Sequence, residues 1–166
     1  MSEELNYQEA EWELLATVPQ TVAAALMVAH SGGLMRETMA MMEAVDLARE
    51  QFFDSSLVHT VLDRIQRGDT DANDGDNDDA PAHGMEYEAV AQSRQAAVLL
   101  QRAPDREADA YRRFVHFFAD QIAGATKEGG FLGFGGKRVS AKEEEIIAAV
   151  DAALREEKGA IDDRNS

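Results

Sequence analysis

The sequence contains no cysteine, so disulfides, thiolate metal sites, iron–sulfur clusters and thiol catalysis are excluded. Lysine is also scarce, because only four of the 16 basic residues are Lys and the other twelve are Arg. These basic residues stand against 32 acidic ones and leave a formal net charge of −16. Binding to DNA or RNA needs a basic surface that displaces counterions from phosphates. The charge balance therefore predicts that nucleic acid is not a partner.

The acidic, lysine-poor composition also bears on the solvent in which the chain works. In molar salt, repulsion between like charges is screened within about 3 Å. A strongly acidic surface is then tolerated and keeps the protein soluble. We therefore expect a halophilic protein in a high-salt cytoplasm, with an ordinary acidic protein as the alternative.

Long hydrophobic runs are lacking as well. Leu14–Met35 carries no formal charge and has about the length of a membrane span, but it contains Pro19 and the pair Gly32-Gly33. Its apolar part, Val22–Ala29, is too short to span a bilayer, so a buried central helix is expected and no membrane partner. The acidic start, Met1–Glu4, lacks the basic and apolar segments of a signal peptide, which predicts a cytoplasmic protein.

The apolar residues recur with helical periodicity, and no run of alternating β-branched residues is present. Residues 1–166 are therefore predicted to form one all-α domain, a bundle of about six or seven helices. The first expected helix opens at an Asn6–Glu9 capping box and runs through Trp12 and Leu15, and Pro19 breaks or restarts it before Gln20–His30. The next helices are Leu34–Phe53, a helix capped by Asp54 or Ser55 with an apolar stripe from Leu57 to Ile65, Tyr87–Gln101 and Asp105–Ala125. The last helix opens at a Ser140–Glu143 capping box, with Ile146, Ile147, Val150 and Leu154 facing inward.

Two segments have no helical pattern. Residues 68–84 are expected to form a mobile acidic loop, and residues 158–166 a frayed tail. An EF-hand needs Gly at position six and Glu at position twelve of its loop. Counted from Asp69 or Asp71, Gly75 falls on position seven or five, and position twelve is an alanine. The acidic run is thus interpreted as solvated charge, and no metal site is predicted.

The segment Gly129–Gly136 is the most distinctive local feature. A Walker loop would need Gly where Phe131 stands and Ser or Thr where Arg138 stands. The dinucleotide fingerprint fails too, because Arg138 replaces its last glycine. The favoured interpretation is a tight reversal that packs its aromatic residues into the bundle. The alternative is a weak anion-binding site at the start of the last helix, with the residues Gly135, Gly136, Lys137, Arg138 and Ser140.

Histidine and methionine offer two further possibilities. His59 with Asp63, and His116 with Asp120, are each four residues apart and could present two metal ligands on one helical face. Both pairs point away from the apolar stripes, so we expect surface pairs instead. Five of the seven Met lie between residues 27 and 42, where core packing is expected and a soft partner surface or a copper(I) site is the alternative.

No arrangement of a nucleophile with a base, nor a pair of inward carboxylates, can be assigned from the sequence. We therefore predict no catalytic residues and no cofactor.

The glycine-rich segment also resembles a known family. Lys127 to Gly136, followed by Val139-Ser140 and a Glu-rich helix, is similar to an uncharacterised bacterial and archaeal all-helical family with a Gly-Gly-Phe-Leu-Gly-Phe-Gly-Gly segment near its C-terminus. The upstream half is similar more loosely, in a Trp near the start and a Pro-initiated helix of small residues. The resemblance implies an all-α fold and supplies no activity.

Two functions lead among those compatible with these observations, and an enzyme is a third possibility, since a pocket built from distant helices leaves no local motif. The leading hypothesis is a non-enzymatic helical bundle that acts through protein contacts, with another protein or as a homo-oligomer. The alternative is a regulator that binds a small anionic ligand through the glycine-rich segment and the following helix start.

The halophilic hypothesis predicts that folding depends on salt. Far-UV circular dichroism should show helix content rising steeply between low and molar KCl, because salt screens the repulsion among the excess acidic side chains. A chain that is already fully helical at low salt would contradict it.

Overall fold

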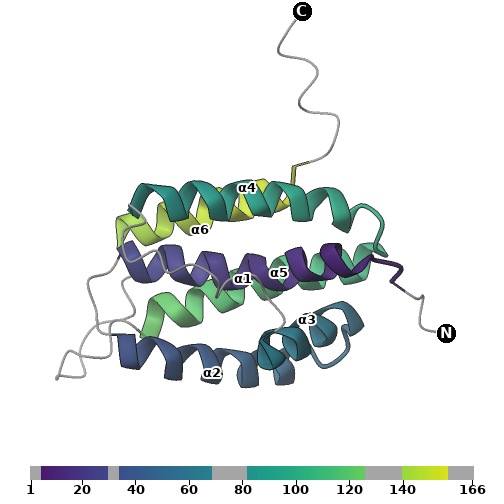
Figure 1. The fold of residues 1–166 in the computed structure, drawn as a ribbon, viewed down its shortest axis with the longest axis horizontal. Helices are drawn as coiled ribbons and strands as arrows, with labels where there is room; N and C mark the ends of the chain where they lie inside the picture. The colour runs from purple at the N-terminus through teal and green to yellow at the C-terminus, as the bar shows by residue number, and fades with distance from the viewer. Residues whose placement is uncertain (1–4, 30–33, 69–81, 126–139, 157–166) are drawn as a thin grey trace, which may run out of the picture.

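The structure is a computed structural model, and it describes residues 5–29, 34–68, 82–125 and 140–156. Within these ranges the chain forms six helices and no strand, so the predicted all-α bundle is confirmed (Figure 1). The helices are α1 (Glu9–Ala29), α2 (Leu34–Gln51), α3 (Ser56–Arg67), α4 (Ala82–Leu100), α5 (Asp105–Ala125) and α6 (Ala141–Leu154).

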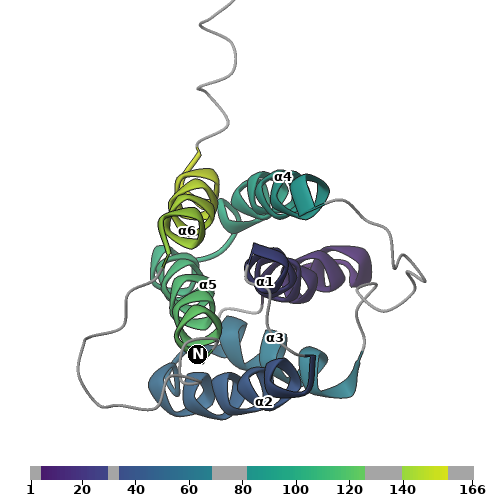
Figure 2. The same cartoon turned by 90° about the vertical axis from the view of Figure 1, so that its left-hand side faces the viewer.

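Helix α1 is the central element. Viewed along the bundle, it lies between α4 on one side and the layer of α2 and α3 on the other, with α5 beside it and α6 next to α4 (Figure 2). It packs against α3, α4, α5 and α6. By length and composition α1 could cross a membrane, but 56% of its apolar window is buried inside the bundle. Its burial agrees with the expectation of a central helix.

Pro19 does not break α1, contrary to the sequence-based expectation. The helix runs through it without interruption from Glu9 to Ala29. Proline has no backbone N–H, so it leaves the carbonyl four residues earlier, that of Leu15, without its helical donor. The buried hydroxyl of Tyr111 on α5 donates to this Leu15 carbonyl oxygen at 2.8 Å. A side chain 96 residues away thus replaces the hydrogen bond that proline removes.

The first helix also begins later than expected. The carbonyl of Gln8, not that of Asn6, accepts the first helical hydrogen bond, from the N–H of Trp12. The Glu11 carboxylate reaches back to the Gln8 N–H at 2.8 Å. Half of a capping box is therefore formed, shifted by two residues from the Asn6–Glu9 pair.

The expected caps of α3 and α6 are confirmed. Ser55 caps α3 by accepting from the Val58 N–H, and α3 ends at Gly68, whose φ of +74° is the left-handed conformation that glycine adopts without strain. Ser140 and Glu143 form a reciprocal capping box at the start of α6. The inward residues expected on α6 are buried: Ile146, Ile147, Val150 and Leu154.

Helix α4 begins at Ala82 rather than at Tyr87, so it takes in the last residues of the expected acidic loop. Pro81 comes directly before it, and proline suits a helix start better than a helix interior. The rest of that loop (69–81), most of the glycine-rich segment (126–139) and the expected tail lie outside the described residues.

The methionines of α2 only partly follow the expected core packing. Val45 is buried, and Met41 and Met27 pack against the core from its edge. Met39 and Met42 are 73% and 67% exposed. At about 100° per residue, Met39 lies on the far side of α2 from the face that Met41 and Val45 share, and Met42 lies at the edge of that face. The expectation of a methionine core is thus wrong for these two residues.

The hydrogen bond from Tyr111 to Leu15 should be worth more than an average one, because without it a buried carbonyl has no partner. We expect Tyr111→Phe to lower the free energy of unfolding by about 1–3 kcal/mol, measured by urea denaturation. In a Pro19→Ala background the same substitution should cost clearly less, because alanine at this position restores the backbone donor.

Tyr7→Phe is the matched control. The Tyr7 hydroxyl donates to the Leu99 carbonyl at 2.9 Å, but that carbonyl also accepts from the Arg102 N–H. Its loss should cost about 1 kcal/mol or less. Equal costs of Tyr111→Phe with and without Pro19 would show that the two residues are not coupled.

Candidate functional site

Of the five ligand residues predicted from the sequence, only Ser140 lies among the described residues. Gly135, Gly136, Lys137 and Arg138 lie outside the described residues. Ser140 is described, and both its side chain and its N–H are engaged with Glu143 in the capping box, at 3.3 and 2.7 Å. The groups of Ser140 that would face an anion are therefore used by the helix itself.

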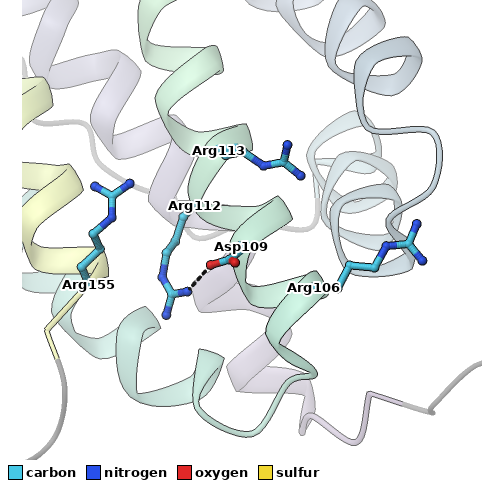
Figure 3. Close-up of a pocket in the computed structure, with 5 residues that line it drawn as sticks. All are labelled: Arg106, Asp109, Arg112, Arg113 and Arg155. Carbon is cyan, nitrogen blue, oxygen red and sulfur yellow. Dashed lines mark hydrogen bonds and ion pairs between the residues drawn. The ribbon is translucent and has the colours of Figure 1, made fainter.

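The described residues form a different basic site. An open hollow of about 390 Å³ lies between α5 and the end of α6 (Figure 3). We call it the arginine hollow, and its lining residues are Arg106, Asp109, Arg112, Arg113 and Arg155.

The periodicity of α5 explains why four of these residues share a side. Tyr111, Phe114 and Phe118 form its buried stripe, and all three are fully buried. Arg106 and Arg113 are seven residues apart, which is close to two helical turns, so both lie on the opposite, solvent-facing side. The amphipathic pattern that builds the core thereby also gathers the arginines.

Arg155 joins them from the C-terminal cap of α6. The contact is fixed by Arg112, whose Nε donates to the Leu154 carbonyl at 3.0 Å. Because the last carbonyls of a helix have no helical donor, this bond both caps α6 and ties its end to α5.

Two of the four arginines are held by carboxylates. Arg112 pairs with Asp109 at 2.9 Å, and Arg106 pairs with Asp54 after α2 at 2.5 Å. The hydrogen bond from Arg106 lowers the pKa of the Asp54 carboxyl, and the charge of Arg113 adds to the shift. Both arginines are therefore oriented by the protein.

Arg113 and Arg155 differ from these two. Both side chains are exposed, and in the part of the chain that the structure describes neither has a carboxylate within ion-pair distance. Figure 3 shows the four guanidinium groups spread around the hollow rather than converging on one point. In a chain with twice as many acidic as basic residues, such a cluster is a local concentration of positive charge.

A second hollow of about 430 Å³ adjoins the first and shares Arg112, Arg113 and Arg155 with it. Its character is different, because two carboxylates and an aromatic ring take the place of further arginines. The residues that only the second hollow has are Gln51, His116, Phe117, Asp120 and Asp151.

His116 organises the two carboxylates. Its Nδ1 lies 2.7 Å from Asp151 on α6, and its Nε2 lies 3.4 Å from Asp120 one turn further along α5. The expected surface pair with Asp120 is therefore confirmed, and Asp151 adds a link between the helices. Within the described ranges, no three His, Cys, Asp or Glu side chains gather as a metal site would need.

The other histidine pair expected on a surface is not formed. Asp63 pairs with Arg49 of α2 at 2.9 Å. His59 is only partly exposed, and its Nε2 is buried and makes no hydrogen bond to the described residues. The prediction of a surface His59–Asp63 pair is wrong, because α2 covers this side of α3 and supplies a stronger partner for the aspartate.

Sequence reasoning placed the basic site near Lys137 and Arg138 and missed the arginine hollow. A signal was present: four of the twelve Arg fall between residues 102 and 113, in an otherwise acidic chain. Arg155 could not have been added to them from the sequence, since its place depends on how α6 packs on α5.

No family model, no curated protein and no solved structure matches the chain. The resemblance of the glycine-rich segment to a helical family therefore stays a prediction. The residues of the two hollows are the basis on which a function can be inferred.

If Arg113 and Arg155 serve a ligand rather than the fold, their removal should leave stability unchanged. We expect Arg113→Gln and Arg155→Gln to alter the free energy of unfolding by no more than about 0.5 kcal/mol. Arg112→Gln should cost about 1 kcal/mol, because the Asp109 and Leu154 contacts are lost. Urea denaturation at fixed KCl, without phosphate or sulfate, makes the comparison, and equal losses for Arg113 and Arg112 would indicate a structural role for Arg113.

Proposed function

We propose that this protein is a small helical bundle that binds a ligand carrying two or more anionic groups in the arginine hollow. The observation that carries the proposal is the pair Arg113 and Arg155, exposed at one hollow without carboxylate partners among the described residues. The proposal takes up the anionic ligand that the sequence analysis gave as its alternative hypothesis, and it moves the site from the glycine-rich segment to the α5–α6 junction.

The chemistry of the lining supports an oxyanion ligand. A guanidinium donates two parallel N–H groups to a carboxylate or phosphate, which gives direction as well as charge. Arg106 and Arg112 are already oriented by Asp54 and Asp109, so a ligand does not have to order them. The volume of about 390 Å³ lies within the range of roughly 300–1,000 Å³ that is typical of small-ligand sites.

The spread of the guanidinium groups supports more than one anionic group. Groups that surround a hollow from two helices cannot all reach one small oxyanion, whereas a ligand with separated charges can contact both sides (Figure 3). Such a ligand would link α5 to α6 at Arg113 and Arg155. The net charge of −16 repels anions at long range, so recognition of an anionic ligand depends on contacts inside the hollow.

A thermal-shift series tests the proposal. Pyrophosphate should raise the melting temperature more than orthophosphate does at the same concentration, because it carries two anionic groups that can contact different arginines of the hollow. The Arg113→Gln/Arg155→Gln double variant should lose the shift, which at a hundredfold excess over Kd corresponds to about 2.7 kcal/mol.

Two controls locate the site. Arg49→Gln removes a basic residue whose partner is Asp63, on the α2–α3 side, and should keep the shift. The Lys137→Ala/Arg138→Ala variant tests the site expected from the sequence. Loss of the shift in that variant, with retention in the double arginine variant, would move the site to the glycine-rich segment.

A second candidate function is self-association through α2 and the turn after it. Met39, Met42 and Phe53 are 73%, 67% and 76% exposed, and exposed flexible methionines are common at adaptable protein contacts. Light scattering coupled to size exclusion in molar KCl should then show a dimer that Met39→Gln/Met42→Gln weakens. A monomer at every concentration would remove this candidate.

A further inference from the structure

The two hollows differ in charge although they share three arginines. Among the described residues that line the arginine hollow, Asp109 is the only acidic one, and its carboxylate is paired with Arg112. The second hollow contains two carboxylates, Asp120 and Asp151, which flank His116. The lining of the arginine hollow is therefore the more positively charged of the two. The second hollow suits an uncharged part of the same ligand.

Its side chains indicate what that part is. Phe117 lines the second hollow one helical turn after Arg113, so the aromatic ring and the guanidinium are neighbours on one face of α5. The ring also contacts Phe52 edge-on, at a centroid distance of 5.9 Å, which fixes its position. Phe117 is half-buried, so the part of the ring that lines the hollow is an apolar surface at a fixed position.

Hydrogen-bonding groups surround the ring. Gln51, the last residue of α2, lines the same hollow and carries both donors and an acceptor that can pair with the edge of a heterocycle. The Asp120 and Asp151 carboxylates accept hydrogen bonds from hydroxyl groups. A nucleotide has three parts, and each has a counterpart in the two hollows. The arginines suit its phosphates, the Phe117 ring suits its base, and the Asp120 and Asp151 carboxylates suit the hydroxyl groups of its sugar.

We propose that the two hollows form one site for a nucleoside diphosphate or triphosphate, with the phosphates among Arg106, Arg112, Arg113 and Arg155 and the base against Phe117. This proposal rests on the proposed function, because the phosphates use the arginine hollow. It adds the class of ligand and assigns the second hollow to the base and sugar. The site differs from both nucleotide motifs that the sequence fails to match, since it uses side chains of packed helices and no phosphate-binding loop.

Isothermal titration of the full chain with three probes tests the proposal, at one KCl concentration and with a chelator present. The probes are ADP, pyrophosphate and adenosine. ADP should bind about tenfold more tightly than pyrophosphate, as expected for one base stacked on an aromatic ring. Adenosine alone should bind most weakly, because it lacks the charged groups.

Variants of Phe117 assign that difference to the ring. Phe117→Leu keeps an apolar side chain and should remove the advantage of ADP while pyrophosphate binding persists, which also shows that the variant is folded. Phe117→Tyr keeps the ring and should keep the advantage.

The possible failures are distinguishable. Equal affinities for ADP and pyrophosphate, or an advantage of ADP that survives Phe117→Leu, would overturn the nucleotide assignment and leave the arginine hollow as an anion site. If neither ADP nor pyrophosphate binds, both proposals are overturned.

Discussion

The hydrogen bond from the Tyr111 hydroxyl to the Leu15 carbonyl replaces the donor that Pro19 removes from the central helix α1. It lies where α5 crosses the central helix α1, and both residues are fully buried. Burial raises the pKa of Tyr111 well above its usual value of 10.0, so the hydroxyl keeps the proton that it donates. Because Tyr111 is held by α1, the opposite side of α5 faces solvent, and this side carries Arg106, Arg113 and His116. The inner contact and the outer site are therefore two faces of one amphipathic helix.

Most of the helices could be predicted from the sequence, because their signals are local. Asp105–Ala125 has a strong apolar stripe, and the Ser140 capping box needs only neighbouring residues. The predictions that failed depended on distant parts of the chain. Pro19 was expected to break a helix, and the continuation of α1 could not be foreseen because the Tyr111 hydroxyl that replaces the missing donor lies 96 residues away. Met39 and Met42 share helical spacing with Val45, and only the packing of α2 on α5 determines which side of that stripe faces inward.

The candidate site shows the same limit more strongly. Phosphate-binding loops are recognised by contiguous residues. The sequence therefore indicated an anion site only at the glycine-rich segment and Lys137-Arg138. The arginine hollow has no contiguous motif, because it combines one face of α5 with the cap of α6. It depends on how the end of α6 packs on α5, where Arg112 donates to the Leu154 carbonyl, and no sequence pattern encodes this contact. What the sequence does contain is an uneven distribution of charge, with arginines concentrated at the start of α5 in an acidic chain.

The cap of α3 has a consequence for the order in which the chain can fold. One oxygen of Glu107, on α5, accepts from the Ser55 hydroxyl at 2.7 Å and from the Leu57 N–H at 2.9 Å. Helix α3 has 12 residues, and isolated helices shorter than about 12–15 residues are only marginally stable in water. During synthesis from the N-terminus, α3 therefore leaves the ribosome about 50 residues before the carboxylate that completes its cap. Its stable formation waits for α5, so the first half of the chain acquires its final structure only after the second half has been made.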